Sequence, residues 1–156
     1  MHWIDQIPTL TIMEQLEEIE KEKLKGSYFN LLALFLSLPQ VDSRHVRCLI
    51  KWSVQMEISA DDIVKLGKDL VQLTYAAPST EEAKLKSVYH LVYMIYLDRV
   101  IEDVELEVAM IYAEKIGLNK IVVAKLFQSI ATASADGITP EQLEKEVLEF
   151  MTSNQI

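Results

Sequence analysis

Two segments that are apolar on almost every face constrain the fold of this chain most strongly. They read YFNLLALFLSL at 28–38 and SVYHLVYMIYL at 87–97. A helix that is apolar all round belongs inside a bundle, because it has no polar face to turn toward water. Both segments are too short to cross a bilayer, which takes roughly 20 apolar residues. We therefore expect two buried helices, side by side at the centre of the molecule.

The remaining apolar residues follow helical spacing, and no stretch alternates convincingly with a period of two. Only four glycines and four prolines are present, which is little material for the many turns of a β-sandwich. The pattern predicts one all-α domain over 1–156, a single bundle of about seven or eight helices. It includes an N-terminal helix over about 11–24 and a C-terminal helix over about 139–153.

Residues typical of helix ends mark several of the expected boundaries. A change of texture near Gly26 separates the N-terminal helix from the first central segment. Small polar residues are expected to begin five helices, and Gly117 is expected to end one in the left-handed conformation. The expected starting residues are Ser43, Ser59, Ser79, Asn119 and Thr139.

The order of a buried helix, a break and an amphipathic helix occurs twice, with an offset of 60 residues. Of the 21 apolar positions between 31 and 70, 18 meet an apolar residue 60 positions later. Internal similarity of this kind is typical of a duplicated structural unit. We therefore predict two repeated helical units, at about 27–76 and 87–133, related by a pseudo-two-fold axis.

An acidic break follows the second central segment. Residues 98–107 read DRVIEDVELE, five acids against one arginine. Hard divalent cations prefer several carboxylate oxygens that converge from a turn and the adjoining helix. Asp98, Glu102 and Glu105 are therefore candidate ligands for Ca²⁺, Mg²⁺ or Mn²⁺, with Ile101 pointing inward to anchor the turn. The alternative is electrostatic capping, because Glu102 and Glu105 have the spacing of a capping box.

Residues 96–118, YLDRVIEDVELEVAMIYAEKIGL, resemble the signature of TerB-like domains, which are named for tellurite-resistance proteins. The family's pattern of an Asp-Gly turn, an apolar residue, a helical Glu and a Leu-Gly-Leu-type ending falls on Asp98, Arg99, Ile101, Glu105 and 116–118. The resemblance implies an all-helical, duplicated fold over roughly 27–151, with divalent metal at acidic turns. Arg99 replaces the family's glycine, and the first unit reads LPQVDSRHV at the matching place. The resemblance thus implies at most half of the family's metal sites.

Other residues with chemical potential are weighed against structural roles. A cluster of tyrosines either forms a small apolar pocket between the repeats or packs in the core with its hydroxyls at the rim. His90 is expected to be a satisfied core histidine and Cys48 a small buried hydrophobe. No phosphate-binding loop, GxSxG elbow or HExxH motif occurs, so we expect no enzyme. The tyrosines are Tyr89, Tyr93, Tyr96 and Tyr112.

The net charge of -9 disfavours nucleic-acid and anionic-membrane partners, which attract basic surfaces. A single cysteine and an acidic N-terminal segment predict a cytoplasmic protein without membrane insertion. Three functions remain open: a TerB-like binding module in stress response or envelope-associated signalling with a weak divalent-cation site, a purely structural module, and a metal-dependent hydrolase. The structural module would bind a protein partner or form a homodimer through an apolar face, one including Trp3, Ile4 and Ile7.

Overall fold

The computed structural model describes residues 18–39, 42–58, 75–97 and 100–153. These residues form six helices and no strand, which confirms the all-α class. The count is below the seven or eight expected. The expected helical segment after Ser59 and the first half of the expected helix 11–24 lie outside the described residues. The helices are α2 (Glu18–Leu36), α3 (Ser43–Gln55), α5 (Glu81–Tyr96), α6 (Asp103–Lys115), α7 (Ile121–Ala135) and α8 (Pro140–Ser153).

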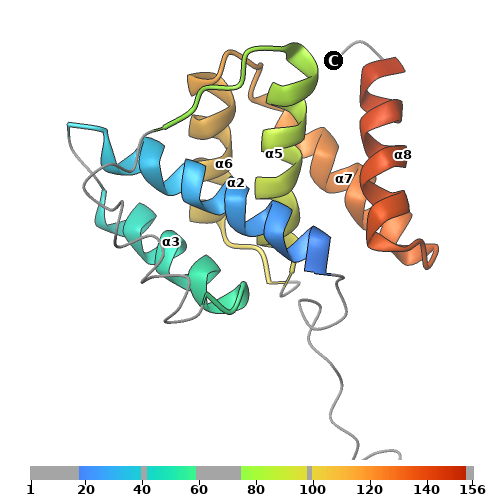
Figure 1. Cartoon of the computed structure of the whole chain (residues 1–156), viewed down its shortest axis with the longest axis horizontal. Helices are drawn as coiled ribbons and strands as arrows, with labels where there is room; N and C mark the ends of the chain where they lie inside the picture. Colours follow the sequence, from blue (N-terminus) through green and yellow to red (C-terminus); the bar gives the residue numbers. More distant parts are fainter. Residues whose placement is uncertain (1–17, 40–41, 59–74, 98–99, 154–156) are drawn as a thin grey trace, which may run out of the picture.

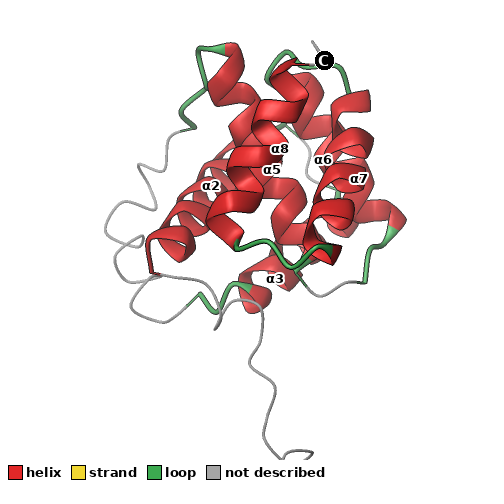
Figure 2. Ribbon diagram, turned by 90° about the vertical axis from the view of Figure 1, so that its right-hand side faces the viewer, coloured by secondary structure: helices red, strands yellow, loops and turns green. Residues whose placement is uncertain are grey.

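Helix α5 is the centre of the bundle. It contacts each of the other five described helices, and every residue from Val88 to Ile95 is buried. Figure 1 shows α2 crossing α5 and α6, with α3 beside α2. In the view turned by 90° α2 lies on one side of α5, and α6 and α7 lie on the other (Figure 2). The expectation that 87–97 forms a buried central helix is therefore confirmed.

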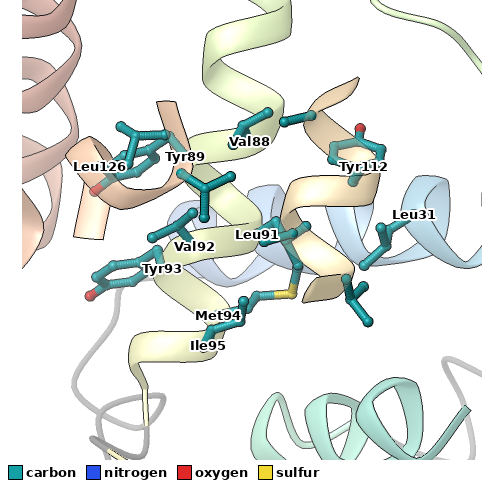
Figure 3. Close-up of a cluster of buried hydrophobic side chains, with 14 of the residues drawn as sticks. Leu31, Val88, Tyr89, Leu91, Val92, Tyr93, Met94, Ile95, Tyr112 and Leu126 are labelled. Carbon is teal, nitrogen blue, oxygen red and sulfur yellow. The ribbon is translucent and has the colours of Figure 1, made fainter. Parts of the chain in front are cut away.

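The core is built from the apolar faces of the helices around α5. Figure 3 shows Leu31 of α2, Tyr112 of α6 and Leu126 of α7 converging on it from different directions. All three side chains are almost completely buried. Burying one large aliphatic side chain stabilises a fold by about 1.5–3 kcal/mol, and this shared core joins α2, α6 and α7 to α5.

One predicted helix boundary is wrong. Gly26 lies inside α2, which runs without a break through the expected gap between an N-terminal helix and a central one. A glycine inside a helix is unfavourable by only about 1 kcal/mol relative to alanine. Leu24 and Tyr28, on either side of Gly26, are both buried in the core. Packing on both sides therefore outweighs the local preference of Gly26.

The predicted helix starts that fall on described residues, at Ser43, Ser79, Asn119 and Thr139, are correct to within one residue. Asp42, rather than Ser43, caps α3, and Thr80, rather than Ser79, caps α5 through its bond from Ala83 N–H. Asn119 accepts a hydrogen bond from Ile121 N–H at 3.0 Å, as expected for the start of α7. The start of α8 at Pro140 also follows the prediction, with the Thr139 hydroxyl accepting from Gln142 N–H at 3.4 Å.

Helices α3 and α6 share several local features at an offset of 60. Helices α3 and α6 each contain 13 residues, and their bounds differ by 60 at both ends. Each is followed by a residue with positive φ, Glu57 at 53° and Gly117 at 92°. The next residue donates a backbone hydrogen bond into the last turn in both cases, Ile58 to Ser53 at 3.1 Å and Leu118 to Ala113 at 2.9 Å. Both helices therefore end in the same way.

None of the helices that the structure describes combines the length and the hydropathy needed to cross a bilayer.

Candidate functional site

The acidic break forms the first turn of α6. Glu102 is the N-cap residue, and Glu105 is the third helical residue. The Glu102 backbone N–H donates to Glu105 Oε1 at 3.0 Å, and the Glu102 side chain completes the capping box. The capping box is therefore confirmed. Asp98, the third candidate ligand, lies outside the described residues.

Glu105 is the most deeply buried charged residue among those described, with an exposed fraction of 0%. Its carboxylate is nevertheless well partnered. Trp52 Nε1 of α3 donates to Glu105 Oε2 at 2.6 Å, and Lys51 Nζ donates to Oε1 at 3.1 Å. A buried carboxylate is tolerated only when hydrogen bonds and an opposite charge replace its water shell. Helix α3 supplies both of these.

The Lys51 ammonium lies at a point where three oxygens of the turn converge. It is 3.1 Å from Glu102 Oε1, 3.1 Å from Glu105 Oε1 and 3.4 Å from the Val100 carbonyl oxygen. The Lys51 side chain is 27% exposed, whereas that of Glu102 is 59% exposed. The ammonium therefore lies between buried and solvent-facing carboxylates.

The same interface carries a second, more exposed group of charges. Arg44 of α3 lies 2.9 Å from Asp42 and 3.6 Å from Glu107 of α6. The hydrogen bonds from Arg44 lower the pKa of Asp42 to about 2. His45 Nε2 lies 3.5 Å from Glu107 Oε2. The basic side chains of α3 thus face the acidic side chains of α6 along the helix contact.

These contacts limit the metal-binding chemistry of the turn. Both oxygens of Glu105 already accept hydrogen bonds from protein groups. Within the described ranges, no group of three or more His, Cys, Asp or Glu residues is arranged to hold a metal ion. A cation that bound Glu105 through Oε1 would have to displace Lys51.

Cys48 lies on α3 and is inert toward nucleophilic chemistry. It is buried, as expected. Burial, together with the negative charge of Glu105 and Glu102, raises the pKa of its thiol to about 11. A thiol is reactive mainly as the thiolate, so Cys48 packs as a small apolar side chain.

The prediction that Ile101 points inward is wrong. Its side chain is 42% exposed and lines a groove of about 450 Å³ between α6 and α7. The inward anchor at this turn is Glu105 instead, because it is wholly buried and its carboxylate accepts hydrogen bonds from Lys51 and Trp52 of α3. We call this feature the α6–α7 groove; its lining residues are Tyr96, Ile101, Leu106, Met110, Val123, Ala124, Phe127, Gln128 and Ala131.

The four candidate tyrosines are distributed over different surroundings. Tyr89 and Tyr93 stack with ring centroids 5.9 Å apart, on the side of α5 opposite Tyr112 (Figure 3). Tyr112 is buried in the core, and burial raises its pKa to about 12. Tyr96 contributes to the α6–α7 groove.

A further polar cluster, which the sequence did not indicate as a unit, joins α2, α5 and α8. His90 is buried, and its Nε2 lies 2.6 Å from Glu144 Oε1. Its Nδ1 lies 2.8 Å from Ser27 Oγ. Lys23 extends the cluster, with Nζ 3.8 Å from Glu144 and 3.2 Å from Glu20. The expectation that His90 is a satisfied core histidine is confirmed.

The hydrogen-bonded series of Ser27, His90 and Glu144 resembles a catalytic triad only in its residue types. Ser27 lies in the interior of α2, where backbone N–H groups bond along the helix and do not form an oxyanion hole. Hydrogen bonding from His90 lowers the pKa of Glu144. The cluster therefore fastens α8 and α2 to the central helix.

Comparison of this chain with protein-family models, with curated proteins and with solved structures finds no match.

Proposed function

We propose that this protein is a non-enzymatic helical binding module, and that it binds an amphipathic helix of a partner protein in the α6–α7 groove. One observation carries this proposal. Every residue that lines the groove, except Gln128, is aliphatic, aromatic or methionine. An apolar groove between two helices is the usual receptor for the apolar face of a partner helix.

The spacing along the groove supports a helical ligand. Leu106 and Met110 form one row on α6, and Val123 and Phe127 form a row on α7, each four residues apart. Residues four apart on a helix lie on the same face. Two such rows create the ridges between which the side chains of a third helix pack.

Charge along α6 indicates the composition of the partner. Asp103 precedes Leu106 by three residues, and Glu114 follows Met110 by four, so both acids lie on the α6 face that borders the groove. Both acids are exposed. We therefore expect lysine or arginine residues to flank the apolar face of the partner helix.

We retain the TerB-like, duplicated architecture as part of this proposal. The equal lengths of α3 and α6 and their matching ends support duplication. The contacts of Glu105 favour a structural role for the acidic turn over a resident metal. We therefore propose a module that acts without a metal or a catalytic reaction.

Photo-crosslinking in the source cells tests the groove directly. A benzoylphenylalanine at Met110 should capture a partner protein, whereas the same group at the exposed Val54 of α3 should not. A labelled synthetic peptide covering the captured segment is then titrated against the purified protein. We expect it to bind as a basic, amphipathic helix.

Charged substitutions decide whether the groove holds that peptide. Ala124→Asp introduces a carboxylate into the groove and should weaken binding at least tenfold, equivalent to about 1.4 kcal/mol. Thr132→Asp, on an exposed position of the same helix outside the groove, is the matched control. Equal affinities of the two variants would contradict the proposal. Crosslinks formed solely between copies of this chain would replace it with a homodimer.

A further inference from the structure

We propose that Met110 is a site of reversible oxidation by peroxide, and that its sulfoxide weakens the binding of a partner helix in the α6–α7 groove. This regulation rests on the function proposed for the groove, because it acts on the same surface. Met110 lines the groove from α6, one turn after Leu106.

Met110 carries the most accessible sulfur among the residues that the structure describes. It is partly exposed and packs only one side against the core. Every other described sulfur belongs to a side chain that is no more than 3% exposed. Oxidation by a dissolved oxidant follows the exposure of the sulfur, so Met110 is expected to react first. The four buried residues are Cys48, Met56, Met94 and Met151.

The oxidation transfers one oxygen atom from the peroxide to the thioether. The sulfur donates an electron pair to one peroxide oxygen, and the S–O bond forms as the O–O bond breaks. The other oxygen takes up the proton of the transferred oxygen and leaves as water. The sulfur is thereby oxidised and the peroxide reduced. The product is methionine sulfoxide, which sulfoxide reductases convert back to methionine.

The sulfoxide places a strong hydrogen-bond acceptor on a surface that is otherwise apolar. Apart from Tyr96 and Gln128, the lining side chains are entirely hydrocarbon or thioether. Solvent hydrates the sulfoxide oxygen while the groove is empty, because Met110 is partly exposed. The apolar face of a docked helix would remove this water and offer no donor in its place. Burying an unsatisfied acceptor is unfavourable, so the affinity for the helix should fall.

Peptide mapping by mass spectrometry tests the site of modification. The full chain is treated with hydrogen peroxide under native conditions and digested after increasing times. We expect the Met110 sulfoxide to form before that of any other described methionine. The same treatment in urea should abolish this preference, because unfolding exposes every sulfur. Earlier oxidation of Met56, Met94 or Met151 in the folded protein would overturn the inference.

Binding is measured with a labelled leucine–lysine peptide that forms an amphipathic helix, the class of ligand proposed for the groove. Peroxide treatment should weaken its binding to the wild type at least tenfold, equivalent to about 1.4 kcal/mol. Incubation of the treated protein with methionine sulfoxide reductases and a dithiol should restore the affinity.

Met110→Leu is the matched control. Leucine conserves the apolar volume but has no sulfur to oxidise, so this variant should bind the peptide equally before and after treatment. It also controls for Met1 and Met13, which lie outside the described residues and are present in both proteins. An equal loss of affinity in treated Met110→Leu and treated wild type would overturn the inference.

Two further comparisons separate this regulation from the function on which it rests. Equal binding by untreated wild type and Ala124→Asp would contradict the proposed function and overturn the inference with it. Where the untreated wild type binds more tightly than Ala124→Asp, unchanged affinity after oxidation of Met110 would overturn the inference alone. Circular dichroism should show the same helical signal before and after treatment. Loss of that signal would also overturn the inference, because unfolding would then explain the loss of binding.

Discussion

Helices α3 and α6 have the same length and end in the same way, yet they carry opposite charge. Helix α3 contains Arg44, Arg47 and Lys51 and no acid, whereas α6 contains four acids and one lysine. The two helices pack against each other, and the basic groups of α3 contact the acidic groups of α6. The acidic turn is therefore half of an internal charge pairing. Its excess of negative charge cannot be interpreted without the helix that it faces.

The contrast between the two helices predicts where the interface is most sensitive. Glu105 is wholly buried, and Glu107 is partly exposed, although both pair with cations of α3. Desolvation makes a buried charge far more dependent on its partners than an exposed one. We therefore expect the pairing to be most sensitive to substitution at Glu105.

Removing the Glu105 carboxylate should have the largest effect. We expect Glu105→Ala to lower the free energy of unfolding by about 3–5 kcal/mol, because the buried Trp52 Nε1–H and the nearby ammonium lose their acceptor. Urea unfolding followed by circular dichroism measures the change. Glu107→Ala is the matched control and should change the free energy by less than about 1 kcal/mol. Similar losses of unfolding free energy in the two variants would show that the burial of Glu105 does not make its ion pair more important than that of Glu107.

The Trp52 hydrogen bond should make the next largest contribution. Trp52→Phe is expected to destabilise by about 1–3 kcal/mol, because one oxygen of a buried carboxylate loses its donor. A double-mutant cycle with Glu105→Leu, measured by the same unfolding experiment, separates this bond from the loss of packing. We expect Trp52→Phe to be less damaging in the Glu105→Leu protein. A coupling of zero would contradict a stabilising role for the bond.

The His90–Glu144 pair gives a pH dependence away from the α3–α6 interface. Because His90 lowers the folded-state pKa of Glu144, the ionised carboxylate stabilises the fold. This stabilisation is present above the unfolded-state pKa of about 4.3 and is lost as the pH falls through the lower folded-state value. Replacing Glu144 by Gln should reduce the slope of unfolding free energy against pH below pH 4.3, by at most about 1.4 kcal/mol per pH unit. An unchanged slope in urea titrations would refute this assignment.

The smallest effects concern the matching ends of α3 and α6. Glu57→Gly should stabilise the protein by about 1 kcal/mol, because φ at this position is 53° and glycine adopts positive φ without steric strain. Gly117→Ala should destabilise it by a similar amount, since φ there is 92°. Calorimetric unfolding of both variants tests the comparison. If the two substitutions changed the free energy of unfolding in the same direction, the two helix ends would not be equivalent.

Much of the local structure could be predicted from the residues themselves. The apolar segment 87–97 indicated a buried helix because no face of it is polar, and Thr139 with Pro140 marked the start of α8. Gly26 misled the prediction, since its weak helix preference was outweighed by the burial of Leu24 and Tyr28.

The candidate site was only half visible in the sequence. The capping box could be predicted because Glu102 and Glu105 are three residues apart. Lys51 lies 54 residues from Glu105, and Trp52 lies 53 residues from it. No local pattern connects residues at such distances, so the acidic turn was interpreted without its counter-charge.

The sequence by itself determined the helices, their capped ends and the burial of α5, because these depend on local conformational preference and on apolar periodicity. Only the tertiary structure decided the role of Glu105, the partners of His90 and the exposure of Ile101. Each of these depends on which face of one helix meets another. That choice is made by packing over the whole bundle, and it determines whether a carboxylate meets water, a metal or a lysine.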